Sequence, residues 1–276
     1  MATIREIKDE IQFSSELRGL LEIMKNIAIF KFRSMQKKKQ RFLQFSTLLK
    51  HFFGMIDLEK TPKFLIDPEQ KRAVIVMITS NEGFMGGLNL QVINWACLQQ
   101  QTPEDEMMIV GERGAQHLRD LGKNFVEYKS AADSEEIYNL AEYLKKDVML
   151  KMASKRFGQV IVVYPNPVSF MVQRVEVLKL LPVADDFKTR QNVNRVAIVE
   201  SPEEKIVEYL IGEEMLQRFL DILEDSKLAE FSARAIHLEK SSQELLKKEK
   251  KLRFQYFRAY HEIIDENTRE LFQPRL

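Results

Sequence analysis

The sequence predicts an α/β protein in which an open, mainly parallel sheet domain is flanked by two long terminal helices that form an antiparallel coiled coil. Residues 203–273 contain one glycine, Gly212, and no proline, and residues 1–57 contain two glycines and no proline. Because glycine and proline mark helix ends, each terminal segment is expected to be one long helix. Between them, apolar β-branched runs alternate with helical segments, which is typical of a parallel sheet covered by helices.

The predicted domains are an N-terminal shaft helix (1–60), an α/β domain (72–200) and a C-terminal shaft helix (201–274) that pairs with the first. At about 1.5 Å per residue, the two helices would be roughly 80 and 100 Å long. A domain of about 140 residues is only about 30–40 Å across. The helices must therefore bury their apolar stripes on each other or on a partner. A long shaft on a small domain indicates a protein that transmits force or position rather than one that catalyses a reaction.

The first helix carries apolar residues at steps of three and four, as an amphipathic helix does. One predicted stripe comprises Leu17, Leu20, Met24 and Ile27, and a second comprises Phe42, Phe45, Leu49, Phe52 and Ile56. Residues 27–30 are apolar on most sides of the helix, which predicts that a partner encloses this part.

The last helix opens with a capping signal, Ser201-Pro202 followed by Glu204. Further along, its apolar seam alternates steps of three and four, which indicates a coiled coil. The seam comprises Leu228, Phe231, Ala235, Leu238, Ser242, Leu245, Glu249, Leu252, Tyr256, Ala259 and Ile263. Its small and polar members can fix the register of pairing. We expect cysteines placed near Met24 and Ile263 to crosslink within one chain.

The middle of the chain alternates between strands and helices. Strands are predicted at residues 73–79, 107–110, 124–128, 159–164, 172–181 and 195–199, helices at 88–100, 114–121 and 134–155, and a loop at 187–194. Ser134 is the expected N-cap of the third of these helices.

Composition and motifs exclude several classes of function. A formal net charge of +1 gives no general attraction to nucleic acid or to an anionic membrane. The single cysteine, Cys97, excludes an internal disulfide and a cysteine-based zinc site. The four histidines lack metal-ligand spacing, and Walker and nucleophile-elbow motifs are absent. We therefore predict no catalytic residues, no metal, no cofactor and no membrane span.

One motif could bind a phosphate. Residues 79–89, TSNEGFMGGLN, follow a predicted buried strand and precede a helix, where a dinucleotide-binding loop would lie. Glu112 could then bind a ribose. The alternative is a structural turn built on Gly83, Gly86, Gly87 and Asn89, because the glycine spacing does not fit the dinucleotide pattern and glycines allow close backbone approach. We favour the structural turn.

Two basic clusters lie on the terminal helices. The first comprises Lys37, Lys38, Lys39 and Arg41, and the second comprises Lys247, Lys248, Lys250, Lys251 and Arg253. In an antiparallel pair they could form one basic collar, which would need an acidic partner. The alternative is two solvated faces.

These segments resemble the γ subunit of F-type ATP synthases along nearly the whole chain. The turn TSNEGFMGGLN is similar to the family's T-S-D-x-G-L-C-G-G-L-N, with Phe84 and Met85 as departures. The first helix is similar to A-M-K-M-V-A-A-x-K-x-R-x-x-Q, matching it at Met24, Lys25, Lys31, Arg33 and Gln36. The segment AEFSARAIHLEKSS resembles S-E-x-x-A-R-M-x-A-M, matching it at Glu230, Ala233 and Arg234. The stretch 252–264 departs most, because only Leu252 and Arg258 match there.

The resemblance implies a central-stalk rotor without catalytic activity of its own. Its partners would be the α and β subunits of the catalytic hexamer, the ε subunit and the ring of c subunits. It would reach the membrane only through that complex, on the cytoplasmic face of a bacterial inner membrane, and nucleic acid would not be a partner. The implied shaft contacts are Met24, Lys25, Arg33, Arg234 and Arg258 together with the two basic clusters.

Three other functions fit parts of the pattern. One is a nucleotide-binding enzyme domain with coiled-coil arms, which requires a ligand at residues 83–87. A second is a coiled-coil scaffold whose helices pair between chains. The third is a rotor-like subunit of a specialised F-type-like ATPase that does not make ATP.

Overall fold

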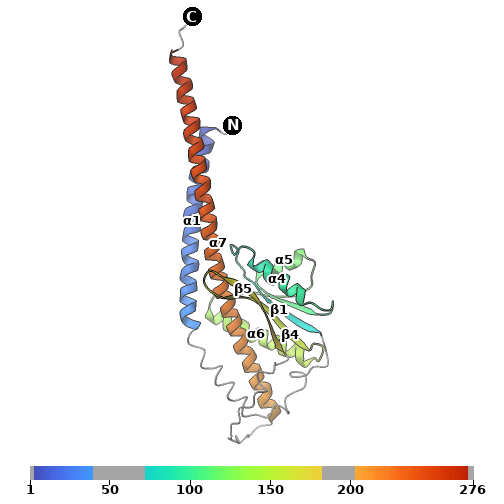
Figure 1. The fold of residues 1–276 in the computed structure, drawn as a ribbon. Coiled ribbons are helices and arrows are strands. Elements are labelled where there is room, and N and C mark those ends of the chain that lie inside the picture. Colours follow the sequence, from blue (N-terminus) through green and yellow to red (C-terminus); the bar gives the residue numbers. More distant parts are fainter. Residues whose placement is uncertain (1–2, 40–71, 182–202, 273–276) are drawn as a thin grey trace. The chain divides into compact units, whose positions relative to one another are not determined.

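The computed structural model describes residues 3–39, 72–181 and 203–272, which fall into two compact units. The first unit combines Met1–Phe30 with Arg234–Leu276, and the second spans Lys31–Ala233. Helices α1 (Ile4–Lys39) and α7 (Glu203–Phe272) each contribute to both units (Figure 1).

Several predictions from the sequence fall outside the described residues. They are the domain limits at residues 60, 200, 201 and 274, the apolar stripe 42–56, the loop 187–194, the strand 195–199 and the Ser201-Pro202 capping signal.

The second unit contains a five-stranded sheet in the order β3-β2-β1-β4-β5. The strands are β1 (Ala73–Ile78), β2 (Glu106–Val110), β3 (Val126–Tyr128), β4 (Gln159–Pro167) and β5 (Gln173–Leu181). All neighbours are parallel except β4 and β5, which form an antiparallel hairpin. The predicted open, mainly parallel sheet is therefore confirmed.

Helices cover both faces of this sheet. Helices α4 (Leu88–Gln99) and α5 (Glu112–Asp120) pack on one face, whereas α6 (Ser134–Ala153) and the first part of α7 pack on the other. Strand β1 is buried at all six positions, because alternate side chains enter the two cores. This two-sided burial explains why the strand is a continuous apolar run rather than an alternating one.

Two aspartates anchor local structure in this unit. The N-cap of α6 is Asp133 rather than the predicted Ser134, because the Asp133 carboxylate accepts hydrogen bonds from the Glu135 and Glu136 amides at 3.0 and 2.9 Å. Asp105 accepts hydrogen bonds from the Ala73, Gln101 and Thr102 amides. Burial of Asp105 acts to raise its pKa, but these hydrogen bonds outweigh it and hold the pKa below its usual value.

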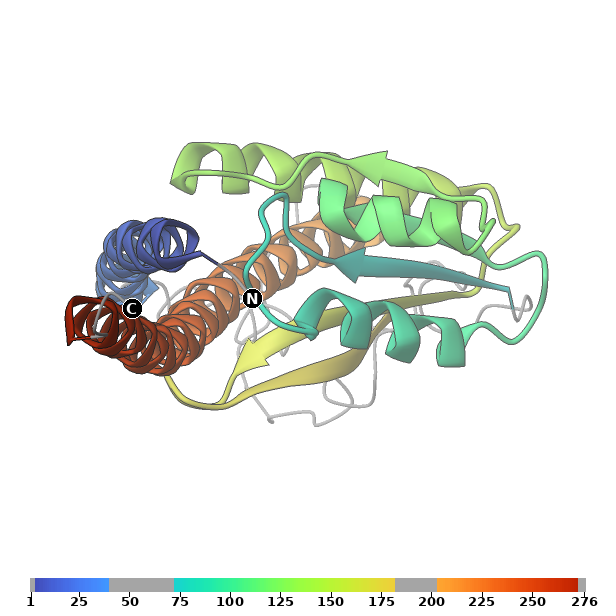
Figure 2. The same cartoon turned by 90° about the horizontal axis from the view of Figure 1, so that it is seen from above.

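In the first unit, α1 lies antiparallel alongside the C-terminal part of α7 (Figure 1), and Figure 2 shows the two helices side by side from above. Lys25 Nζ lies 2.8 Å from Glu239 Oε2, and Glu10 Oε1 lies 2.7 Å from Lys248 Nζ. The pairing of the terminal helices within one chain, which the heptad seam predicts, is therefore confirmed. Within the described ranges, no helix is long and apolar enough to cross a membrane.

Candidate partner interface

The side of α1 that packs on α7 is not the predicted one. In the first unit, α1 has a heptad seam of less exposed residues with alternating steps of four and three, namely Ile7, Ile11, Ser14, Arg18, Leu21, Lys25 and Ala28. Ile4, Ser15, Leu17 and Ile29 are also partly buried. Leu20, Met24 and Ile27, from the predicted stripe, are exposed. The prediction failed because the true seam contains polar residues that an apolar pattern does not include.

Two polar members of this seam form ion pairs with α7. The Lys25 ammonium donates a hydrogen bond to Glu239, which holds the pKa of Glu239 below its usual value. This pair contributes stability above the ordinary pKa of glutamate and loses it as the pH falls through the lowered value. Arg18 Nε lies 3.7 Å from Glu249 Oε2, and Glu249 is only 4% exposed.

These ion pairs also correct the predicted crosslink. Because Lys25 lies opposite Glu239, Met24 and Ile263 are separated by about 24 residues along α7, or roughly 36 Å at 1.5 Å per residue. A cysteine pair at Lys25 and Glu239 is the appropriate test of antiparallel pairing.

The first unit exposes large apolar side chains away from the seam. On α1 they are Phe13, Leu20, Ile23, Met24, Ile27 and Phe30, which we call the outer face, and on α7 they are Phe254, Phe257, Tyr260 and Ile264. Ile263, the last predicted member of the α7 seam, is also exposed, at 45%, so the prediction was wrong at this position. Ile27 is 51% exposed, whereas its neighbour Ala28, in the seam, is 2% exposed. Exposed apolar side chains gathered in this way along one helix mark an interaction site.

The predicted shaft contacts occupy several different environments. Among the basic residues of α7, Lys247, Lys250 and Lys251 are exposed and form no ion pair within the described ranges, whereas Lys248 pairs with Glu10 and Arg253 with Glu249. Arg258 is exposed and pairs with Glu262, and Arg234 is buried. Arg33 and Lys37 are exposed on the part of α1 that belongs to the second unit. The side chains of Lys38 and Lys39, and all of Arg41, lie outside the described residues.

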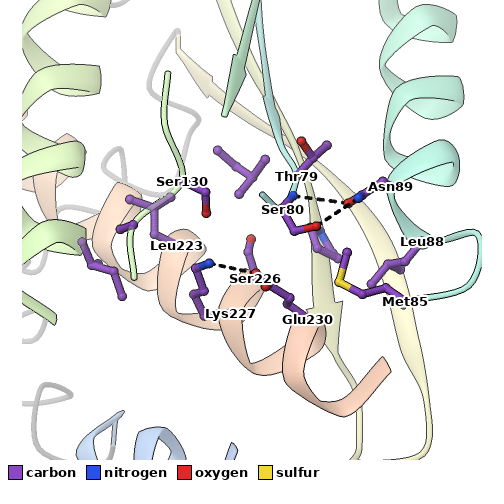
Figure 3. Close-up of a pocket in the computed structure, with 14 residues that line it drawn as sticks. Thr79, Ser80, Met85, Leu88, Asn89, Ser130, Leu223, Ser226, Lys227 and Glu230 are labelled. Atoms are coloured by element: carbon purple, nitrogen blue, oxygen red, sulfur yellow. Dashed lines mark hydrogen bonds and ion pairs between the residues drawn. The ribbon is translucent and has the colours of Figure 1, made fainter. Parts of the chain in front are cut away.

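The turn at residues 79–89 is held by side-chain hydrogen bonds at the carboxyl ends of the parallel strands (Figure 3). The Ser80 amide donates to Asn89 Oδ1 at 3.3 Å, and Asn89 Nδ2 donates to Ser80 Oγ at 3.0 Å. Asn81 Nδ2 donates to the Ser130 carbonyl at 2.9 Å, and Asn81 Oδ1 accepts from the Glu112 amide at 3.1 Å. Asn81 thus joins the segments that follow β1, β2 and β3.

The glycines of this turn differ in their roles. Gly86 has φ +61°, a left-handed conformation that favours glycine. A Cβ added at Gly83 would meet no atom within 4 Å, and one at Gly87 would touch only the end of Gln91. The predicted close approach occurs instead at Gly111 and Gly114, which both pack against Thr79.

The cavity beside the turn is small. It has a volume of about 10 Å³ and lies between the turn, Ser130 and the part of α7 that includes Leu223, Ser226 and Glu230 (Figure 3). A volume of about 10–15 Å³ holds roughly one water molecule. This cavity could therefore not hold a nucleotide, and Glu112, the predicted ribose ligand, is exposed and does not line it.

A known protein family matches nearly the whole chain. The family model described as ATP synthase matches residues 3–272. The chain belongs to the ATP synthase family. The ATP synthase gamma chain of Halothermothrix orenii is 24% identical over 98% of this chain and 97% of its own length. That of Pelotomaculum thermopropionicum is also 24% identical, over 85% of this chain and 84% of its own.

Solved structures agree with this ATP synthase family assignment at the level of the fold. A chain of the Euglena gracilis mitochondrial ATP synthase, in a structure described as OSCP/F1/c-ring, superposes with a TM-score of 0.71 and is 16% identical, covering 97% of this chain and 92% of its own. A chain of the Tetrahymena thermophila central stalk and c-ring superposes with a TM-score of 0.59, is 20% identical, and covers 81% of this chain and 99% of its own.

Sequence reasoning missed three groups of residues in this ATP synthase family member. Asn81 gives no signal beyond its place after a buried strand. Gly111 follows a strand and Gly114 lies within α5, so each looks like an ordinary connector. Arg18 was missed altogether, and Lys25, which the resemblance implied as a shaft contact, was not recognised as a member of the seam. The two lie seven residues apart, and each lies three residues before an apolar seam member, Leu21 or Ala28, which could have revealed them.

Proposed function

We propose that this chain is the central-stalk rotor subunit of an F-type ATP synthase and has no catalytic activity of its own. The first unit would turn inside a hexamer of α and β subunits, where ATP is made or hydrolysed. The second unit would contact the ε subunit and the ring of c subunits. In a bacterial cell, the complex would place the chain on the cytoplasmic face of the inner membrane.

The observation that carries this proposal is the outer face of the two-helix unit. A two-helix coiled coil that buries its seam should cover its other sides with polar residues if water surrounds it. Here Ile27 and Phe30, which is 72% exposed, extend the apolar surface away from the seam. A shaft that turns inside an apolar ring of partner subunits needs such a surface, because its contacts with the ring must be remade as it turns. Membership of the ATP synthase family supports α and β subunits as the members of this ring.

Lysine substitutions at Ile27 and Ala28 separate this function from stability. Ile27→Lys should leave the isolated chain folded, because exposed substitutions change stability by only about 0.5 kcal/mol. It should nevertheless reduce ion pumping per ATP hydrolysed after reconstitution with the other subunits. Ala28→Lys should destabilise the first unit by about 2 kcal/mol or more, because it buries a charge in the seam. Thermal unfolding and coupled pumping measure the two effects. Unchanged coupling in the Ile27→Lys complex would remove the outer face from the proposed contact.

The exposed lysines of α7 are expected to attract an acidic partner surface. Reversing Lys247, Lys250 and Lys251 to glutamate should weaken assembly most at low ionic strength, because exposed charges are screened over about 8 Å at 0.15 M salt. Each single alanine should be nearly silent, since an exposed pair contributes about 0–1 kcal/mol. The measurement is the yield of complex with the α and β subunits alone, against salt concentration. The control places the same charge change at Lys146, Lys155 and Lys205, which are exposed in the second unit. Equal yields for both triple variants would indicate solvated faces.

A further inference from the structure

Two loops of the second unit contact the terminal helices at one level of α7. In the turn between β1 and α4, Met85 and Leu88 pack against Ala233. In the hairpin between β4 and β5, Phe170 packs edge-on against Phe32 of α1, with ring centroids 5.0 Å apart. The same Phe32 lies in a cluster with Leu228 and Phe231 of α7. Figure 1 shows this hairpin ending beside α7.

The two loops contact different sides of α7: the hairpin bonds Ser232 through Gln173 and packs on the cluster that contains Phe231, whereas the turn packs on Ala233. Phe231 and Ala233 are two residues apart, which is about 200° around a helix of 3.6 residues per turn. A contact on one side would let a helix roll, whereas contacts on different sides resist rotation about its axis.

A polar contact adds a directional constraint to the hairpin. Gln173 Nε2 donates to the Phe170 carbonyl at 2.9 Å and to Ser232 Oγ at 3.0 Å. Ser232 is fully buried, and its hydroxyl in turn donates to the Leu228 carbonyl at 2.9 Å. Hydrogen bonds require a particular geometry, so this link holds the hairpin at one position on α7 where apolar contacts alone would allow sliding.

We propose that Met85, Leu88, Phe170 and Gln173 form a clamp that fixes the rotational position of α7 and of Phe32 relative to the sheet. The clamp lies at the limit of the second unit, since that unit begins at Lys31 and ends at Ala233. Rotation that starts in the sheet-containing unit must pass to both helices, and the clamp joins the sheet to both of them. This role rests on the proposed rotor function.

Hydrogen exchange in the isolated chain tests the clamp itself. The double variant Phe170→Ala/Gln173→Ala should lower the protection of residues 228–233 by roughly tenfold through local opening, while β1 and β4 keep theirs. Met171→Ala is the matched control, because Met171 is in the same hairpin but is 67% exposed. For the other loop, Leu88→Ala is compared with Leu90→Ala, whose side chain is exposed on the same helix. Unchanged protection of residues 228–233 in the hairpin variant would overturn the clamp even if the Leu88 variant does not fold.

Coupling in the reconstituted complex tests what the clamp does. The Phe170→Ala/Gln173→Ala complex should retain ATP hydrolysis and lose ion pumping per ATP hydrolysed, and the Met171→Ala complex should match the wild type. If exchange at residues 228–233 rises but pumping per ATP is unchanged, the role in transmission is wrong. If the wild-type chain does not assemble with α and β subunits, the proposed function fails, and the exchange experiment still decides whether the clamp exists.

Discussion

Replacing Gly111 with alanine should prevent the second unit from folding stably. Gly111 has φ +105°, and an added Cβ would lie 2.6 Å from the carbonyl carbon and oxygen of Thr79. The strained conformation costs about 1–3 kcal/mol, and the overpacking adds typically 1–3 kcal/mol. The backbone cannot easily move away, because the Gly111 amide donates to the Tyr128 carbonyl at 2.9 Å and Thr79 Oγ1 donates to the Gly111 carbonyl at 3.3 Å. Since domains are stable by only about 5–15 kcal/mol, this loss is severe.

Two other glycines separate the causes of this loss. Gly122 also has a positive φ, +67°, but an added Cβ would meet no atom within 4 Å, so Gly122→Ala isolates the conformational cost. Gly19 lies within α1 in open space, and Gly19→Ala should stabilise the chain by about 0.5–1 kcal/mol. Urea unfolding followed by circular dichroism gives all three values. Equal destabilisation by Gly111→Ala and Gly122→Ala would show that contact with Thr79 does not matter.

The sheet could be predicted from the sequence because its strands are buried on both faces. Residues 73–78 and 160–164 are apolar without alternation, a pattern that a strand under two helical layers requires. The seam of α7 was also readable, since Leu238 and Leu252 are buried at predicted heptad positions. In both cases one physical requirement, burial of an apolar face, determines the pattern.

The partner face of α1 could not be predicted in the same way. This helix is apolar on two sides, and periodicity alone does not say which side meets α7. The side with the larger residues, including Leu20 and Ile27, is exposed, whereas the seam contains Ala28 and the paired cations Arg18 and Lys25. A helix that serves both an internal seam and an outer surface carries two signals, and the stronger one here belongs to the outer surface.

The turn glycines show a second limit on prediction from sequence. The motif made Gly83, Gly86 and Gly87 conspicuous, but only Gly86 has a conformation that favours glycine. Among the glycines whose surroundings the structure describes, Gly111 and Gly114 leave no room for a side chain, because Thr79 at the end of the neighbouring strand fills the space. That neighbour is 32 residues away from Gly111 in the chain, so no local pattern contains it.

Replacing Glu249 with lysine should separate α1 from α7 in the first unit. The Glu249 carboxylate is buried between Arg18 of α1 and Arg253 of α7, and it accepts hydrogen bonds from Arg253 at 2.7 and 3.1 Å. A lysine there would face two arginines with no anion between them. Breaking a fully buried pair costs about 3–5 kcal/mol, and partial exposure of both arginines reduces this to roughly 2 kcal/mol. Glu244→Lys, at an exposed position of the same helix, should be nearly neutral in thermal unfolding.

Removing the buried charges altogether should have the opposite effect on stability. In Arg18→Leu/Glu249→Leu, two apolar side chains replace an ion pair whose Arg18 Nε and Glu249 Oε2 atoms are buried without a hydrogen bond. Such replacements are often neutral or stabilising by about 1–4 kcal/mol. If this variant unfolds at a higher temperature than the wild type, and Glu249→Lys at a lower one, then the ion pair does not stabilise the first unit relative to apolar side chains. A lower temperature for both would contradict that conclusion.

The remaining role for the pair is to fix the register of the two helices. Apolar seams repeat every seven residues, so α1 could slide by one heptad along α7 and still bury apolar side chains. The Arg18–Glu249 pair opposes this, because a shift would move Arg18 away and leave Arg253 as the only cation beside the buried Glu249 carboxylate. With Cys97 replaced by serine, cysteines at Lys25 and Glu239 should crosslink in the otherwise unchanged chain, whereas cysteines at Lys25 and Leu246 should not. In the Arg18→Leu/Glu249→Leu background, the shifted pair should also crosslink. If only the Lys25–Glu239 pair crosslinks there, the apolar members alone set the register. If α1 can slide along α7, the outer face that the rotor presents to the α and β subunits changes. Loss of register should therefore reduce ion pumping per ATP hydrolysed even where stability rises.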